Sequence, residues 1–142
     1  MLYIGVDLGT SAVKMLLMEG NGKIVNVVSK EYPLYFPNPG WSEQKPEDWW
    51  KAVTEGMKEL TADCDKSQVA GISFGGQMHG LVILDKDDNV IRPALLWNDG
   101  RTFEETDYLN NVIGKDTLSK YTANMQNKTK NTTTKRLAVF YK

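Results

Sequence analysis

The sequence predicts an α/β fold in which a β-meander precedes alternating helices and strands. Three apolar runs rich in β-branched residues, separated by turn residues, open the chain: Leu2–Val6, Val13–Met18 and Ile24–Tyr32. A helical pattern then begins at Pro46, and shorter strand-like runs follow from Val69 onward. This order of strand, helix and strand is typical of a sheet with helices packed on it.

The two turns of the meander differ in their chemistry. Gly20, Asn21 and Gly22 tolerate positive φ, so the second and third runs are expected to pair as an antiparallel hairpin. The turn between the first and second runs, Asp7–Ser11, instead combines a glycine with a carboxylate and two hydroxyl groups. We therefore treat it as a candidate site as well as a connection.

The helix is expected to run from Pro46 to about Thr61. Proline suits the first helical position, and the acidic Glu47 and Asp48 suit the positive end of the helix dipole. Apolar residues that recur at spacings of three and four define the predicted buried face: Trp49, Val53, Met57 and Leu60.

The second half of the chain is predicted to hold short strands, turns and two helices. Strands are expected at Val69–Phe74 and Leu95–Trp97, with a hairpin of Leu81–Leu84 and Val90–Ile91 around Asp85–Asn89. Helices are expected from near Thr102, which has capping-box spacing to Glu105, and over Asp116–Tyr121 after a stop at Gly114.

Charge and composition argue against several classes of protein. Seventeen basic and eighteen acidic residues give a net charge of −1, so we expect neither a nucleic-acid partner nor membrane binding. The first residues lack the apolar stretch of a signal peptide, and a cytoplasmic location is expected. A single cysteine, Cys64, and a single histidine, His79, argue against an internal disulfide and a zinc cluster. Any metal ion would therefore be held by oxygen ligands, which suit Mg²⁺ bound beside phosphate.

The turn Asp7–Ser11 has the residue types of a phosphate site. Gly9 lets backbone amides converge, while Thr10 and Ser11 add hydroxyl donors for phosphate oxygens. Asp7, at the end of the strand, would hold Mg²⁺ through water, and Lys14 either reaches the same phosphate or faces solvent. The alternative is a glycine turn that only joins two strands.

The segment Gly75–Gly80 would suit a polyol. Its three glycines leave the backbone open to a small ligand, while Gln77 and His79 offer neutral hydrogen-bonding groups for hydroxyls. The alternative is a glycine-rich bend with a packed Met78 and a hydrogen-bonded histidine.

A second polar segment follows the predicted strand that ends at Trp97. Asn98, Asp99 and Arg101 would lie at a strand end, where open α/β sheets bind ligands. The alternative is an Asn-Asp-Gly turn with a helix cap. Trp41 would either lie beside a sugar ring or belong to a core or interface.

Taken in order, these segments resemble the FGGY-type carbohydrate kinases, and most closely the xylulokinases among them. The resemblance is carried by Ile4–Ser11, Gly40–Gln44, Pro46–Trp50, Gly71–Ser73, Gly76–Gly80, Arg92–Ala94 and Leu96–Thr102. Gln-Met-His-Gly followed by Trp-Asn-Asp-Gly-Arg is characteristic of the xylulokinase-like members. The resemblance implies an actin-like, ribonuclease-H-like α/β fold of two similar domains, with ATP and sugar bound in the cleft between them.

The resemblance also implies roles for individual residues. Those implied for the ATP phosphates and Mg²⁺ are Asp7, Gly9, Thr10, Ser11 and Lys14, with Asp7 holding the metal through water. Those implied for the sugar are Gln77, Met78, His79, Gly80, Asn98, Asp99 and Arg101. The general-base aspartate and the adenosine-binding domain lie, in the family pattern, beyond the matched segment. No catalytic residue is therefore expected in this chain.

The match is expected to cover residues 1–124, the N-terminal part of the first kinase domain. Residues 125–142 hold five basic and no acidic residues, which predicts a divergent tail, either solvated or a non-native, out-of-frame end. The implied function is ATP-dependent phosphorylation of D-xylulose to xylulose 5-phosphate by the parent enzyme, this chain being a truncated piece inactive alone. The alternative is a non-catalytic module that binds sugar or phosphate or serves assembly. Uncovered apolar surface leads us to expect self-association.

Overall fold

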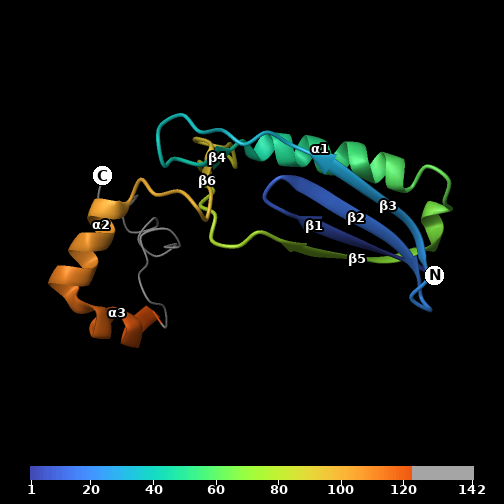
Figure 1. Ribbon diagram of the computed structural model, residues 1–142. Coiled ribbons are helices and arrows are strands. Elements are labelled where there is room, and N and C mark those ends of the chain that lie inside the picture. The colour runs from blue at the N-terminus through green and yellow to red at the C-terminus, as the bar shows by residue number, and fades with distance from the viewer. Residues whose placement is uncertain (123–142) are drawn as a thin grey trace. The chain divides into compact units, whose positions relative to one another are not determined.

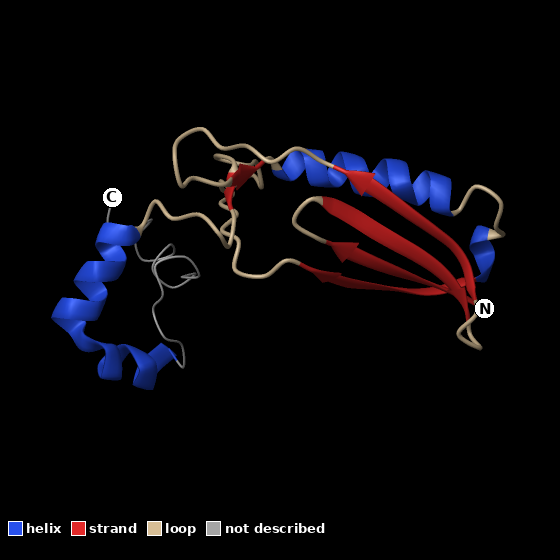
Figure 2. Cartoon of the chain, in the orientation of Figure 1, coloured by secondary structure: helices blue, strands red, loops and turns tan. Residues whose placement is uncertain are grey.

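The computed structural model describes residues 1–122, so the expected tail at 125–142 lies outside the described residues. The described chain divides into two compact units (Figures 1 and 2). Unit 1 comprises residues 1–33 and 45–77, and unit 2 comprises residues 34–44 and those from 78 onward. Each unit is described by itself.

Unit 1 is built on a four-stranded sheet. Its strands are β1 (Leu2–Leu8), β2 (Ala12–Glu19), β3 (Ile24–Glu31) and β5 (Val69–Gly76), in the order β3-β2-β1-β5. β2 runs antiparallel to both β1 and β3, whereas β5 runs parallel to β1. The predicted meander and its second hairpin are confirmed. β1 extends two residues further than expected, so Asp7 lies within the strand and the turn itself is shorter.

Helix α1 (Pro46–Leu60) packs on β2 and β3 and lies along one face of the sheet (Figure 2). Its start and end confirm the predicted helix. The fully buried residues on its inner face are Ala52, Gly56 and Leu60, while the predicted Trp49, Val53 and Met57 are only partly buried. Small residues define the centre of the contact because they let the helix approach the sheet closely. A Cβ atom on Gly56 would lie 2.0 Å from Met15 Cε.

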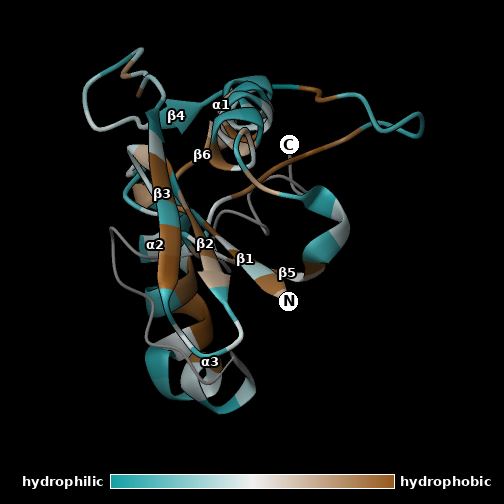
Figure 3. Cartoon of the chain, turned by 90° about the vertical axis from the view of Figure 1, so that its right-hand side faces the viewer, coloured by the Kyte–Doolittle hydropathy of each residue, from teal (hydrophilic) through white to brown (hydrophobic). Residues whose placement is uncertain are grey.

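The core of unit 1 lies between α1 and the sheet. Its buried members are Ile4, Val6, Val13, Met15, Leu17, Val28, Tyr32, Ala52 and Leu60. Figure 3 shows the apolar character of β3, whose Ile24, Val25 and Val27 are exposed. A short 3-10 helix, η1 (Lys66–Gln68), leads from the end of α1 into β5.

Unit 2 contains a small two-stranded sheet. β4 (Glu43–Gln44) pairs antiparallel with β6 (Ala94–Leu95), so the last predicted strand starts one residue earlier than expected and ends two residues sooner. The hairpin predicted around Asp85 is reduced to a single bridge between Leu84 and Val90. Leu81 bridges to Leu95 instead of continuing the hairpin.

Three helical segments follow in unit 2. They are α2 (Phe103–Tyr108), the π-helical η2 (Leu109–Gly114) and α3 (Lys115–Thr122). The predicted capping box is wrong, because Thr102 makes no side-chain cap bond; its carbonyl accepts from Thr106 Oγ1 at 2.8 Å. Gly114 adopts φ of +88° where η2 ends, which confirms the predicted stop before the last helix. Within residues 1–122, no helix has the length and apolar character needed to cross a bilayer.

Candidate functional site

The turn between β1 and β2 is closed by its own backbone. The Gly9 amide donates to the Ala12 carbonyl at 3.0 Å, so three residues reverse the chain. A Cβ atom on residue 9 would lie 3.0 Å from that same carbonyl oxygen, which is tighter than an ordinary contact. Glycine therefore relieves a tight contact at this position of the turn.

Tyr32 holds this turn from the end of β3. Its hydroxyl donates to the Gly9 carbonyl, and its amide donates to the Ser11 carbonyl at 3.2 Å. Burial, with a smaller contribution from the Asp7 carboxylate, raises the pKa of Tyr32 to about 12. Sequence reasoning placed Tyr32 at the end of a strand and missed this contact, because only the β2–β3 register brings it beside residues 9–11.

Asp7 and Lys14 are cross-strand partners on β1 and β2. Both line a hollow of about 470 Å³ on the sheet of unit 1. Its other lining residues are Gly5, Val6, Met15, Leu16, Ile24, Val27, Ser73, Phe74 and Gly75. The structure thus places Asp7 and Lys14, two of the residues proposed for metal and phosphate, at the same hollow. These two side chains have the charges to balance an anion and its cation.

The end of β5 lies beside the end of β1. Parallel pairing sets Gly76 opposite Leu8, and the Gln77 amide donates to the Leu8 carbonyl at 2.8 Å. A Cβ atom on Gly76 would lie 2.9 Å from that carbonyl oxygen. Gly76 therefore allows the two strands to pack closely. The same pairing brings Gln77 to the edge of the sheet where the candidate phosphate turn begins.

In unit 2, the segment that follows Gln77 is exposed. Met78 is 71% exposed, so the packed methionine of the alternative interpretation is wrong. His79 is also exposed and adopts φ of +67°, a left-handed conformation that is uncommon for a residue with a side chain. Gly80 precedes Leu81, whose amide donates to the Leu95 carbonyl at 2.8 Å. An unusual backbone at an exposed histidine is a feature that functional loops often carry.

Asp99 is the centre of a buried hydrogen-bond cluster. Its carboxylate accepts from the Ser42 amide at 2.7 Å and from three nitrogens of Arg101, namely the amide at 3.1 Å, Nε at 2.9 Å and Nη2 at 2.8 Å. Burial acts to raise the pKa of Asp99, but the hydrogen bonds from Arg101 and Ser42 outweigh it and hold the pKa below its usual value. Asp99 is thus a bracing residue with its lone pairs in use.

Glu43 and Trp41 complete the surroundings of Arg101. Glu43 Oε1 accepts from Arg101 Nη2 at 2.7 Å and from Arg92 Nη2 at 3.0 Å. The Trp41 ring lies against the guanidinium, 3.8 Å from ring centroid to Cζ. Sequence reasoning did not find Glu43, because an ion pair between distant segments leaves no local pattern. Trp41 thus packs on a cation of the protein itself while remaining partly exposed.

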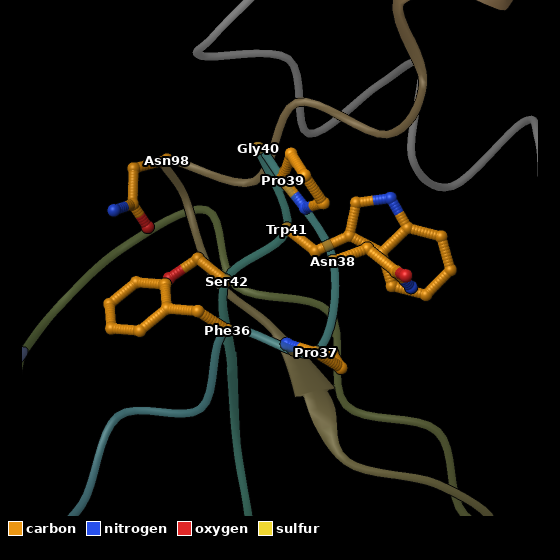
Figure 4. Close-up of a pocket in the computed structure, with 8 residues that line it drawn as sticks. All are labelled: Phe36, Pro37, Asn38, Pro39, Gly40, Trp41, Ser42 and Asn98. Carbon is orange, nitrogen blue, oxygen red and sulfur yellow. The ribbon is translucent and has the colours of Figure 1, made fainter.

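Asn98 is the exposed member of its segment and lines a second hollow, of about 460 Å³, wholly within unit 2. The other lining residues are Phe36, Pro37, Asn38, Pro39, Gly40, Trp41 and Ser42 (Figure 4). In this view the side chains of Asn98, Ser42 and Phe36 lie to one side of the loop and those of Trp41 and Asn38 to the other. The Ser42 hydroxyl is buried and has no hydrogen-bond partner among the described residues. Of the three polar residues predicted here, Asn98, Asp99 and Arg101, only Asn98 is exposed.

Known proteins resemble this chain closely. The model of the FGGY family of carbohydrate kinases, N-terminal domain, matches residues 2–136. A xylulose kinase of Klebsiella pneumoniae is 46% identical over 112 residues, which cover 79% of this chain and 23% of that protein. A xylulose kinase of Bacillus subtilis is 52% identical over 101 residues, covering 70% of this chain and 20% of that protein. The chain thus spans about a quarter of the length of the curated relatives it matches.

A solved structure agrees with this comparison. The crystal structure of a xyloylose kinase from Brucella ovis matches with a TM-score of 0.82 and 38% identity, over 90% of this chain and 27% of that one. The predicted fold class, part of an actin-like α/β domain, is confirmed.

Proposed function

The chain belongs to the FGGY family of carbohydrate kinases, and we propose that it forms the phosphate turn and part of the sugar site of a xylulose kinase. The reaction would be ATP-dependent phosphorylation of D-xylulose to xylulose 5-phosphate. The substrate assignment is supported by several relatives, 40 to 52% identical, that are named xylulose kinases. The observation that carries the site assignment is the pairing of Gln77 with Leu8, which joins two candidate segments at one sheet edge.

The turn of unit 1 is the proposed site for the ATP phosphates. Its residues are Asp7, Gly9, Thr10, Ser11 and Lys14. A turn held closed by Gly9 presents backbone amides in a fixed direction, and Lys14 adds positive charge. Asp7 is an oxygen ligand of the kind that Mg²⁺ takes through water. The metal would neutralise charge on the transferred phosphoryl group.

The loop of unit 2 is the proposed sugar site. Met78, His79 and Gly80 are exposed, and the imidazole of His79 can hydrogen-bond a hydroxyl. Gln77 would contribute from the neighbouring strand end, and Asn98 would offer its carboxamide. For the other two predicted sugar residues, Asp99 and Arg101, we propose a bracing role, because each is engaged by several protein groups.

We assign the general base to neither carboxylate of this cluster. Asp99 accepts four hydrogen bonds, and Glu43 is shared by two arginines. The oxygens of Asp99 are taken up by these bonds, and Oε1 of Glu43 is held by two guanidinium groups, so we propose neither as the group that takes the proton of a sugar hydroxyl. We therefore propose that this chain alone binds ligand without turnover.

A second candidate is a non-catalytic module that associates with itself or with another protein. The observation that favours it is the exposure of Ile72 (50%) and Phe74 (74%) on the edge strand β5, although their partners on β1, Ile4 and Val6, are buried. Apolar side chains on an edge strand favour association.

The purified chain, its mass confirmed, tests the proposal. We expect saturable D-xylulose binding by calorimetry, and no xylulose 5-phosphate when ATP, Mg²⁺ and D-xylulose are supplied. The variant His79→Ala should weaken xylulose binding roughly five- to ten-fold, as expected for one lost hydrogen bond. Lys86→Ala, in an exposed turn of the same unit, is the matched control. Sugar-dependent turnover would contradict the proposal that this chain lacks a general base. Absence of D-xylulose binding would contradict the proposed sugar site.

A further inference from the structure

Tyr32 contacts the candidate phosphate turn through two separate groups. It follows β3 directly and is 7% exposed, with its ring in the core of unit 1. The main-chain amide reaches the Ser11 carbonyl, which continues the β2–β3 ladder by one rung. The side-chain hydroxyl reaches across to the Gly9 carbonyl. One residue therefore holds two of the three carbonyl groups between residue 9 and residue 11.

Holding a carbonyl also sets the direction of the next amide. In a trans peptide the C=O and N–H bonds of one plane point in opposite directions. The Tyr32 hydroxyl draws the Gly9 carbonyl toward the core, so the Thr10 N–H in the same plane is aimed away from Tyr32. The bond to the Ser11 carbonyl fixes the Ala12 N–H in the same way. The directions of the turn's amides thus depend on a residue that lies 23 positions after Gly9 in the chain.

We propose that Tyr32 is a positioning residue that orients the backbone amides of the turn for phosphate, and this inference rests on the proposed function. Its hydroxyl acts through the Gly9 carbonyl and makes no contact with the ligand. A tyrosine that only filled the core would need its ring but not its hydroxyl. The two roles can therefore be separated by removing the oxygen alone.

The variant Tyr32→Phe keeps the ring and removes the hydroxyl. Tyr3→Phe is the matched control, because Tyr3 is 37% exposed and lies near the start of β1, at the opposite end of that strand from the turn. We expect Tyr32→Phe to weaken binding of Mg·ATP roughly three- to ten-fold, the effect of one hydrogen bond, and to leave D-xylulose binding unchanged. Tyr3→Phe should change neither.

A second measurement does not depend on ligand binding. Amide hydrogen exchange followed by NMR should show faster exchange at Gly9, Thr10 and Ala12 in Tyr32→Phe, with the amides of β3 unaffected. Unchanged exchange at the turn, or equal weakening of both ligands, would overturn the positioning role. If the unaltered chain fails to bind Mg·ATP, the proposed function is contradicted, while the exchange data still decide whether Tyr32 orders the turn.

Discussion

The carboxylate of Glu43 lies 2.7 Å from Arg101, and both side chains are only 10% exposed. Glu43 is on β4 and Arg101 precedes α2, so this ion pair joins two segments of unit 2 that are distant in sequence. Asp99 and Trp41 contact the same guanidinium. Arg101 is therefore fixed by three neighbours, which is the basis of the bracing role proposed for it.

Glu43→Gln should destabilise the protein by roughly 1.5 to 3 kcal/mol, because it removes one of the two carboxylates that pair with the largely buried Arg101. Glu19→Gln makes the same change in an exposed pair, where Glu19 lies 3.6 Å from Lys23, and should cost less than about 1 kcal/mol. Urea unfolding of both variants measures the difference. Equal losses would show that the buried pair contributes no more than an exposed one.

Gly76→Ala should destabilise unit 1 by about 1 to 3 kcal/mol, since the new methyl group would press against the Leu8 carbonyl and the strands would have to separate. Gly71→Ala on the same strand is the control, because its Cβ would make an ordinary contact, 3.7 Å from the Tyr3 ring. Thermal unfolding of the two variants compares them. A similar midpoint for both would refute tight packing at residue 76.

The sequence predicted the elements whose signals are local. The meander and α1 follow from turn glycines, apolar runs and a proline at the helix start, all within a few residues of one another. The centre of the helix contact was missed because Ala52 and Gly56 carry little hydrophobic signal, although their small size sets the packing distance. The capping box failed because spacing alone does not give Thr102 the extended backbone of a cap; it has φ of −97° and ψ of 30°.

The sequence singled out the residues of the candidate site, but it did not predict the long-range contacts that hold them. Asp7, Gly9 and Lys14 fall together because a tight turn and a strand register follow from neighbouring positions. The roles of Tyr32 and Glu43 depend on pairing between segments far apart in sequence, for which a single sequence carries no periodic signal.

Because the pKa of Tyr32 is raised, we expect the protein to lose stability in alkali. The pKa of Tyr32 is raised to about 12 in the folded protein, against about 10 for an exposed tyrosine, so its contribution is complete below pH 10 and is lost as the pH rises toward 12. The loss should be on the order of 2 kcal/mol. Unfolding free energies at pH 9 and pH 11.5 should therefore differ less in Tyr32→Phe than in the unaltered chain. An identical pH dependence would contradict a buried, protonated hydroxyl.

Because the pKa of Asp99 is lowered, we expect the protein to lose stability in acid. The folded pKa of Asp99 lies below the ordinary value near 4, so its stabilising effect is present above that value and declines as the pH falls through the folded pKa. Asp99→Asn should lower the unfolding free energy at pH 7 and reduce its further decline between pH 5 and pH 2. Urea titrations at both ends of that range test this. If Asp99→Asn kept the full loss of stability in acid, that loss would have to come from other carboxylates.

The parallel pairing of β1 with β5 has a consequence for the order of folding. β1, β2 and β3 are joined by short turns, so the turn at residues 9–11 forms through local contacts at small entropic cost. β5 can join β1 only after the whole segment from residue 9 to residue 68 has closed into a loop. As a ribosome releases the chain, the meander can assemble before residues 69–76 have emerged. The sheet of unit 1 is thus built in two stages, and the turn proposed for the ATP phosphates forms in the first of them.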